Sequence, residues 1–336
     1  MTEDPASRVV MITGASAGIG RAVAHRFARA GELVGLIARD AEALEDVRRE
    51  VMELGAARAA VAVADVSKAQ QVFAAAEALE AELGPVDLWI NDAMETVFSP
   101  LAEMTPAEFR RVTEVTYLGF VHGTMAALKS MRPRDRGRIL QMGSALAYRG
   151  VPLQSAYCGA KHAIRGFTDS VRAELEHERS AVSIAMIDLP AVNTPQFDWA
   201  RVHIDRQPRP MGRPVEPEVV AEAVFKAAGG SWREYWLGWP TVQTIIANTI
   251  APGLLDRYLA RKAVAGQKTD EPVQDYRRDN LFKPVGPLHR TRGAFSQEAG
   301  HRAVLVPGPV ARAGVVALGA AAFLGLGVLM RGIGRG

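Results

Sequence analysis

The sequence TGASAGIG at residues 13–20 places three glycines directly after the apolar run RVVMI. Such a run is typical of a buried strand, and the alanine-rich sequence that follows is typical of a helix, so a sharp strand-to-helix turn is predicted. Gly14 would allow the abrupt exit from the strand, while Gly18 and Gly20 would let a ligand approach the backbone closely. The free N–H groups of the helix N-terminus would then meet a phosphate. A tight turn without any ligand is the alternative.

The first 190 residues alternate between apolar runs and segments rich in helix-forming residues. The apolar runs are RVVMITG, LVGLIAR, AAVAVADV, PVDLWIND, GRILQMGS and VSIAMIDLP. Segments 19–30, 41–54 and 68–83 lie between them, and REYWLGW at 233–239 is a seventh candidate strand. This alternation predicts an α/β fold with a doubly wound parallel sheet of about seven strands and helices on both faces. Functional residues are then expected just beyond the carboxyl ends of the strands.

Composition and charge narrow the class of protein. Of the 336 residues, 48% are hydrophobic and 23% are charged, which predicts a globular chain. The net charge is only +3 and the arginines are spread out, so nucleic-acid binding is not expected. The single cysteine, Cys158, excludes an internal disulfide and a cysteine-based zinc cluster, and the seven scattered histidines predict no metal site. Because MTEDPASR at the N-terminus lacks the features of a secretory signal, a cytoplasmic location is expected.

The chain is expected to divide into four parts. Residues 1–240 would form the sheet domain, and residues 241–264 an additional helical segment that is interrupted at Pro252. Residues 265–309 are rich in proline, glycine and charge, which is typical of a linker or of a tail that wraps around the domain. Residues 310–332 contain a long apolar run.

That apolar run, AGVVALGAAAFLGLGVLM at 313–330, has 18 residues without a charge and is flanked by Arg312 and Arg331. Its length is near the lower limit of roughly 17–25 residues that a helix needs to cross a bilayer. Its glycine and alanine content makes the hydrophobicity marginal. A C-terminal membrane-anchor helix is therefore one interpretation, and a buried helix or a tail is the other.

The end of the predicted second strand, LIARD, bears on the choice of dinucleotide. An acidic side chain there would accept a hydrogen bond from a ribose 2′-hydroxyl, as in NAD sites. The sequence instead has Ala38 and then Arg39, and an arginine can bind a 2′-phosphate through two donors. NADP(H) is therefore favoured over NAD(H). A solvated arginine is the alternative, and the adjacent Asp40 leaves the choice open.

A candidate acid/base pair lies in YCGAK, where Tyr157 and Lys161 share one helix face at i and i+4. A tyrosine has a pKa of about 10, and a nearby ammonium favours its phenolate. The pair could therefore act in general acid/base catalysis. Ser144 ends the predicted strand RILQMGS, where its hydroxyl could hold a substrate oxygen beside Tyr157. The pair alone is commonly structural, but the combination with the serine and the glycine turn is not.

Five features occur in order: TGASAGIG, ADVS at 64–67, NDA at 91–93, Ser144 and YCGAK. On these features, residues 8–240 resemble the classical short-chain dehydrogenase/reductase family, with a C-terminal extension. The resemblance implies a Rossmann-type fold and an NAD(P)-dependent oxidoreductase that transfers hydride between a nicotinamide and a carbonyl or alcohol. A small-molecule substrate follows from it.

The resemblance also implies residue roles. Tyr157 would donate or accept the proton, Ser144 would orient the substrate, and Lys161 would hold the nicotinamide ribose and lower the pKa of Tyr157. Asp65 would contact the adenine and Asn91 would help to shape the cofactor groove. LPAVNTP at 189–195 is similar to the family's Pro-Gly-x-x-x-Thr stretch, so Thr194 would bind the carboxamide. The expected cofactor-binding residues are Gly14, Ser16, Gly18, Ile19, Gly20, Arg39, Asp65, Val66, Asn91, Ala93, Tyr157, Lys161, Pro190 and Thr194.

Two positions depart from the family pattern. The family usually has Asn-Asn-Ala-Gly where this chain has NDAM, so Met94 replaces a glycine. Thr116 replaces the family's catalytic asparagine, which is thought to anchor a water relay to the lysine. Turnover is expected to survive both changes. The alternative is a catalytically degenerate member that binds NADP(H) as a sensor or a scaffold.

The segment between Pro195 and Pro217 is where the family places its variable substrate loop. Phe197 and Trp199 in this segment predict an apolar wall and a hydrophobic substrate, or a lid that packs on its own helix. The resemblance further implies a homodimer or homotetramer that forms through the predicted helices at about 105–130 and 155–178.

Overall fold

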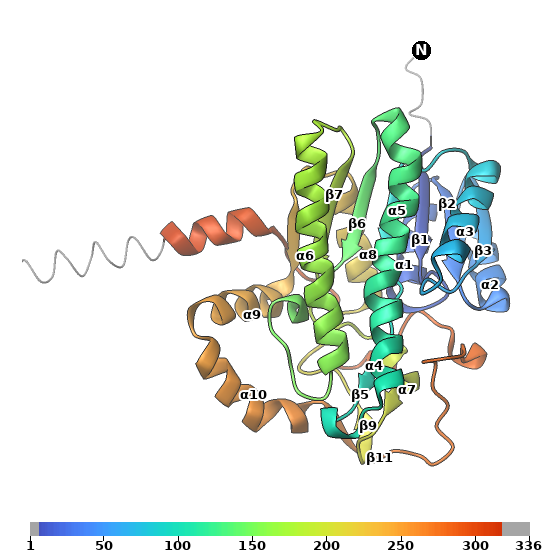
Figure 1. The fold of residues 1–336 in the computed structure, drawn as a ribbon. Coiled ribbons are helices and arrows are strands. Elements are labelled where there is room, and N and C mark those ends of the chain that lie inside the picture. The colour runs from blue at the N-terminus through green and yellow to red at the C-terminus, as the bar shows by residue number, and fades with distance from the viewer. Residues whose placement is uncertain (1–6, 318–336) are drawn as a thin grey trace, which may run out of the picture.

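A single large sheet forms the centre of the molecule in the computed structural model, which describes residues 7–317 (Figure 1). The sheet has eight strands in the order β12-β10-β7-β6-β4-β1-β2-β3. These strands are β1 (Val9–Thr13), β2 (Leu33–Ala38), β3 (Arg58–Val63), β4 (Leu88–Asn91), β6 (Arg138–Met142), β7 (Ser183–Asp188), β10 (Glu234–Leu237) and β12 (Leu305–Pro307). The seven predicted strands are confirmed and pair in parallel. The edge strand β12 is an addition and pairs antiparallel with β10.

Helices cover both faces of the sheet, as the Rossmann-type prediction requires. One face is covered by α1 (Gly18–Ala28), α2 (Ala41–Glu53) and α8 (Pro217–Ala228). The other face is covered by α3 (Ala69–Leu83), α5 (Gly119–Met131) and α6 (Ser155–His177), which Figure 1 shows in front of the strands. Helix α4 (Pro106–Thr113) continues into α5 through a π-helical turn, η2 (Glu114–Leu118).

The strand side chains alternate between two apolar cores. Val10 and Ile12 of β1 lie in the core that contains Phe27, whereas Val9 and Met11 lie in the core that contains Trp89. Both faces of the sheet are therefore buried, which explains why its strands are almost continuous apolar runs. Strand order reverses at β1, which pairs with β2 on one side and with β4 on the other.

Smaller elements gather beyond the carboxyl ends of the strands. They are β5 (Val97–Phe98), β8 (Arg201–Val202), β9 (Arg206–Pro208), β11 (Lys268–Pro272), α7 (Gln196–Trp199), α9 (Gly238–Ile250) and α10 (Pro252–Gly266), with single 3₁₀ turns η1 (Leu101–Glu103), η4 (Ala145–Ala147) and η5 (Gly286–Leu288). A further 3₁₀ turn, η3 (Arg132–Arg134), lies at the opposite edge of the sheet, between α5 and the start of β6. Pro252 begins α10, where its missing N–H leaves no intrahelical bond unmade. β5 pairs with β8, and β11 pairs with β9.

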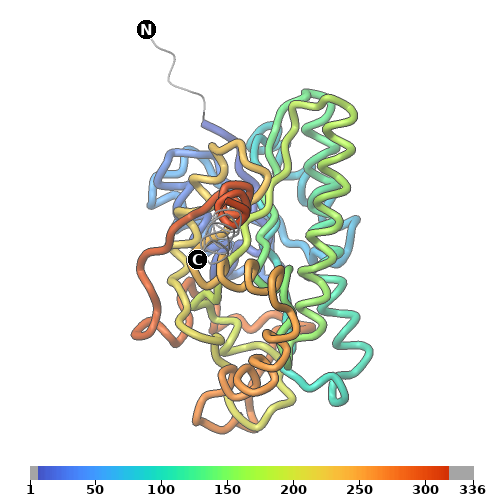
Figure 2. The backbone as a smooth tube through the Cα atoms, turned by 90° about the vertical axis from the view of Figure 1, so that its left-hand side faces the viewer, coloured from blue at the N-terminus to red at the C-terminus, as the bar shows by residue number. Residues whose placement is uncertain are grey.

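The C-terminal part of the chain returns along the domain. Figure 2 shows it as an extended chain on one side of the molecule, before it enters the main sheet as β12. Most of the predicted anchor run at 313–330 lies outside the described residues. Within residues 7–317, no helix combines the length and the hydrophobicity that a membrane crossing requires.

Candidate active site

A cavity of about 800 Å³ lies beyond the carboxyl ends of the central strands. Its wall brings together predicted residues from the glycine turn, from the ends of five further strands and from the start of α6. The predicted residues that line it are Gly14, Ser16, Gly18, Ile19, Arg39, Asp65, Val66, Ala93, Ser144, Tyr157, Lys161, Pro190 and Thr194. Residues far apart in the sequence thus meet at the place that the doubly wound fold predicts.

Two predicted residues, Gly20 and Asn91, lie behind the wall rather than on it. A Cβ on Gly20 would stand 2.4 Å from the carbonyl oxygen of Gly14, so this glycine lets α1 pack against the turn. Asn91 is fully buried, where its Nδ2 donates to Gln141 Oε1 at 2.9 Å and its Oδ1 accepts from Trp89 Nε1 at 2.8 Å. Asn91 therefore ties neighbouring strands together beneath the cavity.

The glycine turn has the backbone geometry that its sequence predicts. Gly14 and Gly18 have φ values of 75° and 55°, in the region that glycine adopts without strain. A Cβ on Gly14 would lie 2.8 Å from the Cα of Ala93, and one on Gly18 would lie 3.3 Å from Thr194. Since α1 begins at Gly18, the turn places the N-terminus of α1 at the cavity. Such a helix start attracts an anion.

Arg39 at the end of β2 is held by neighbours from distant parts of the chain. Its guanidinium pairs with Glu95 and donates to the carbonyl of Asn280 at 2.7 Å. Burial raises the pKa of Glu95 to about 8, although Arg39 acts in the opposite direction. Asp40 caps α2, since its Oδ1 accepts from the amide of Ala43 at 3.1 Å. Asp40 therefore has a structural task that its sequence position alone did not reveal.

Asp65 is also paired. Its carboxylate accepts from Arg111 at 2.8 Å and from the hydroxyl of Ser67 at 2.7 Å. Burial acts to raise the pKa of Asp65, but these hydrogen bonds outweigh it and hold the pKa below its usual value. The carboxylate is thus ionised and fixed at the rim of the cavity.

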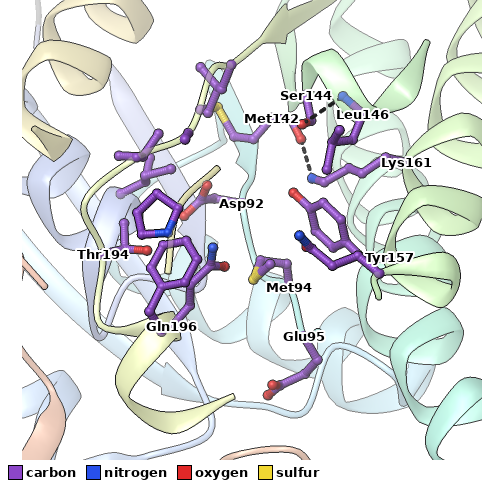
Figure 3. Close-up of a pocket in the computed structure, with 18 of the residues that line it drawn as sticks. Asp92, Met94, Glu95, Met142, Ser144, Leu146, Tyr157, Lys161, Thr194 and Gln196 are labelled. Carbon is purple, nitrogen blue, oxygen red and sulfur yellow. Dashed lines mark hydrogen bonds between the residues drawn. The ribbon is translucent and has the colours of Figure 1, made fainter. Parts of the chain in front are cut away.

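Ser144, Tyr157 and Lys161 lie together on one wall of the cavity (Figure 3). Ser144 follows β6, and its Oγ accepts from the amide of Leu146 at 3.1 Å. Tyr157 and Lys161 lie on the same side of the first turns of α6, with Lys161 Nζ 5.5 Å from the centre of the Tyr157 ring. Lys161 Nζ donates to the carbonyl of Met142 at 2.6 Å.

The ionisation of this wall differs from the sequence-based expectation. Burial raises the pKa of Tyr157, and the Ser144 side chain only partly opposes that rise. Lys161 was expected to lower the pKa of Tyr157, but the direction is the opposite because desolvation of the phenolate dominates. Burial also lowers the pKa of Lys161 to about 8, against the attraction of Asp92 and Asp188.

Two buried acids, Glu95 and Asp188, and the half-buried Asp92 carry no role in the sequence-based prediction. Burial raises the pKa of Asp92 and of Asp188 to about 7 each, and Glu95 behaves similarly. Asp188 supports Ser144, whose amide donates to its Oδ1 at 3.2 Å. Each acid ends or follows a strand at the carboxyl edge of the sheet, which is the one sequence signal that could have drawn attention to them.

The two departures from the family pattern have different consequences. Thr116 is fully buried in η2, where its hydroxyl accepts from the amide of Glu95 and donates to the Glu95 carbonyl, both at 2.9 Å. With both bonds made to one residue, Thr116 is a structural brace and does not face the cavity. Met94, by contrast, lines the cavity beside Tyr157 (Figure 3).

Another part of the wall comes from α7, α9 and α10. Phe197 and Trp199 of α7 line the cavity, and Trp199 lies beside His289, which pairs with Asp40. Phe197 also packs against Phe98 and Phe295, at ring-centre distances of 5.9 and 5.8 Å. Part of its ring is therefore used for packing within the lid segment and not for the cavity wall. Further lining residues come from α9 and α10, namely Thr241, Gln243, Thr244, Ala247, Leu255, Tyr258, Leu259 and Lys262.

The C-terminal tail supplies lining residues that the sequence did not mark as functional. They are Asn280, Pro284 and His289. The tail also bonds to the glycine turn, because the amide of Gly18 donates to the carbonyl of Arg290 at 3.0 Å.

Comparison with known proteins agrees with this architecture. The family model for short chain dehydrogenase matches residues 8–202. An uncharacterized oxidoreductase of Bacillus subtilis, YxnA, is 32% identical over 317 residues, which cover 92% of this chain and 88% of that protein. Dehydrogenase/reductase SDR family member 7B of Bos taurus is 31% identical over 274 residues, which cover 78% of this chain and 83% of that protein.

Among solved structures, an alcohol dehydrogenase from the archaeon Thermococcus sibiricus, complexed with 5-hydroxy-NADP, superposes with a TM-score of 0.60 and 27% identity. The match covers 68% of this chain and 95% of the archaeal chain, so the part beyond it is an extension. The chain belongs to the short-chain dehydrogenase/reductase family of oxidoreductases.

Proposed function

We propose that this protein is an NADP(H)-dependent oxidoreductase that interconverts a carbonyl and an alcohol on a hydrophobic small molecule. The observation that carries the proposal is the placement of Ser144, Tyr157 and Lys161 on one wall of a cavity whose other walls include the glycine turn and Arg39. A hydride donor and a proton donor could therefore reach the same substrate atom pair.

The residues present fit a dinucleotide. The absent Cβ atoms at Gly14 and Gly18 leave a thin turn, and the positive end of the α1 dipole suits a pyrophosphate, although the Gly18 amide already donates to the Arg290 carbonyl. A guanidinium has five N–H donors. Among the described residues, Glu95 and Asn280 accept from Arg39 Nη2 and Leu281 accepts from Nη1, which leaves the Nε–H and one Nη1–H on different sides of the guanidinium. One remaining N–H and the positive charge support NADP(H) over NAD(H).

A bound nicotinamide supplies the hydride, and the chain's own residues handle the oxygen. Ser144 donates a hydrogen bond to the carbonyl oxygen, and Tyr157 gives that oxygen its proton as the alcohol forms. The raised pKa of Tyr157 keeps its phenol protonated near neutral pH, as reduction requires. The Lys161 ammonium stabilises the phenolate left behind, and it is held in place by the Met142 carbonyl.

Apolar side chains in the cavity wall support the choice of substrate class. Phe197, Leu255 and Leu259 are apolar lining residues of the cavity, and they lie on α7 and α10. Burial of apolar substrate surface against them is favourable, whereas a charged substrate would lose its hydration there.

A catalytically silent NADP(H) sensor is the second candidate, and Thr116 is the observation that favours it. Its hydroxyl is committed to Glu95, so it offers no anchor for a water relay to Lys161.

Self-association through α4, α5 and α6 and membrane attachment through residues 310–332 remain predictions. Exposed Phe109 and Met125 on the first two of these helices are compatible with a contact between copies.

The deciding experiment is NADPH oxidation with a panel of hydrophobic aldehydes, ketones and quinones, in which wild type is compared with Tyr157→Phe. Tyr117→Phe is the matched control, because Tyr117 packs edge-on against Phe167 and does not line the cavity. Oxidation that is lost only in Tyr157→Phe supports the proposed reaction. NADPH binding without oxidation of any panel member supports the sensor, and equal rates in both variants contradict the role of Tyr157.

A further inference from the structure

Residues 280–293, here called the tail strap, cross the outer edge of the cavity next to the glycine turn. The carbonyl of Arg290 accepts from the amide of Gly18 at 3.0 Å, and the carbonyl of His289 accepts from Arg21 at 2.8 Å. The tail strap thus spans the helix start that suits a pyrophosphate. At its beginning, it also meets the guanidinium of Arg39 through the Asn280 carbonyl.

The tail strap is anchored where it begins. The Leu281 side chain is fully buried in an apolar cluster with Val97 and Val112. The Leu281 carbonyl accepts from Arg111 Nε at 2.9 Å. Apolar burial and a charge-assisted hydrogen bond therefore fix this end.

It is also anchored where it ends, against the segment that carries Thr194. The amide of Gly293 donates to the Asn193 carbonyl at 3.0 Å, and the amide of Phe295 donates to Asn193 Oδ1 at the same distance. A Cβ on Gly293 would stand 2.5 Å from the Thr194 carbonyl oxygen. The close approach at this end therefore depends on the missing side chain of Gly293.

Between its anchors, the tail strap forms one wall of the cavity without filling it. Asn280, Pro284 and His289 line the same cavity as Gly14 and Arg39. The His289 ring lies between Asp40, at 3.4 Å from Nδ1 to Oδ2, and the Trp199 ring, at 5.5 Å between centres. A ligand on the glycine turn would be enclosed by the tail strap and would share the start of α1 with the Arg290 carbonyl, which already accepts from the Gly18 amide.

We propose that the tail strap is the outer wall of the dinucleotide site, and that it must detach at Gly293 or Leu281 before NADP(H) can leave. The inference rests on the proposed function for the identity of the ligand. Because closure and opening of such a segment commonly limit turnover, it sets the rate of cofactor exchange.

Two variants weaken the two anchors separately. Gly293→Ala forces the tail strap away from Thr194, and Leu281→Ala removes the buried side chain at the other end without touching Thr194. Gly300→Ala is the matched control, because its new methyl group would meet neighbours at ordinary distances of 3.8 to 3.9 Å. Release of NADPH into excess NADP⁺, followed by stopped-flow fluorescence, is expected to be about tenfold faster in both strap variants, which corresponds to roughly 1.4 kcal/mol, and unchanged in the control.

The outcomes separate this inference from the proposed function. Failure of the wild type to bind NADPH at all would overturn the proposed function. If NADPH binds but both strap variants release it at the wild-type rate, the strap proposal is overturned. Slower release from the variants also overturns it, because the wild-type tail would then compete with the cofactor instead of enclosing it. If neither variant folds, hydrogen exchange of the peptide covering 280–293 in the wild type decides. Slower exchange with NADPH supports the inference, and unchanged exchange contradicts it.

Discussion

The cavity has two halves that are built in different ways. The glycine-turn half, around Gly14, Gly18, Arg39 and Asp65, is made of backbone atoms and ion pairs held by buried partners. The helical half, under α9 and α10, is made of side chains of mixed polarity, with Leu255 and Leu259 beside Gln243 and Lys262. Fixed donors select one ligand by geometry, whereas apolar side chains select a class by shape and size. The difference explains why the sequence indicates a cofactor but only a class of substrate.

The largest expected effect is on kcat, and it comes from Tyr157 on the wall between the two halves of the cavity. Tyr157→Phe removes the proton donor and keeps the ring, so kcat should fall by roughly 10² to 10⁴. The Kd for NADPH should stay within about twofold, because the variant keeps the Tyr157 ring and every other residue of the cavity wall. Steady-state kinetics and equilibrium fluorescence titration measure the two quantities. A matching loss of NADPH affinity would mean that the hydroxyl belongs to the glycine-turn half instead.

The pH dependence of stability provides a second test, through Asp188 behind Ser144. Its pKa is raised to about 7 in the folded protein, so between about pH 4 and pH 7 the folded state binds more protons than the unfolded state. Stability from this group is therefore present at low pH and is lost as the pH rises through that window, by up to about 4 kcal/mol. Asp188→Asn should flatten this part of the curve and unfold at higher denaturant concentration at pH 8.

Chemical denaturation from pH 4 to pH 8 gives both curves. Asp169→Asn is the control, because that carboxylate is exposed on α6 and pairs with Arg172 and Arg233 at the surface. Parallel wild-type and Asp188→Asn curves would show that the pKa of Asp188 is the same in the folded and unfolded states, and would contradict the raised pKa.

The fold was predictable because of the burial of the sheet on both faces. A strand that is buried on both faces, such as LVGLIA, is seen in the sequence as an uninterrupted apolar run. The positive φ values at positions 14 and 18 are seen as glycines. β12 could not be predicted, since three residues, LVP, carry no periodicity and their partner β10 is remote in sequence. The local pattern therefore decides most of the sheet but not its edge.

The site was predictable to a similar extent. The motif residues identify the wall, but the direction of a side chain depends on neighbours that the motif does not contain. Asn91 turns away from the cavity because Trp89 and Gln141 bind it from the strands. The pKa of Tyr157 depends on burial created by the whole fold, and the lining role of His289 depends on where the tail returns.

A third prediction sharpens the account of the glycine-turn half. Arg39→Ala should weaken NADPH binding by roughly 10- to 100-fold, the effect of losing a charge-assisted pair with a phosphate, and should leave NADH binding nearly unchanged. Arg48→Ala is the control, because Arg48 is exposed on α2 and pairs with Glu45 one turn away. Isothermal titration with both dinucleotides measures the ratio. Equal losses for NADPH and NADH would assign Arg39 a structural role with Glu95 instead.

The smallest expected effect lies in the helical half, where two adjacent leucines of α10 provide a matched pair. Leu255 lines the cavity, whereas Leu254 does not and is 65% exposed. Leu255→Ala removes apolar surface that a substrate would cover, so kcat/KM for a hydrophobic carbonyl should fall about fivefold, or roughly 1 kcal/mol. Leu254→Ala should leave kcat/KM unchanged, and neither variant should alter the Kd for NADPH. Because each partly exposed side chain contributes so little, several substitutions in α10 are expected to retune the substrate range before they abolish turnover. A single large loss in Leu255→Ala would instead show that the helical half is as narrowly fitted as the glycine-turn half.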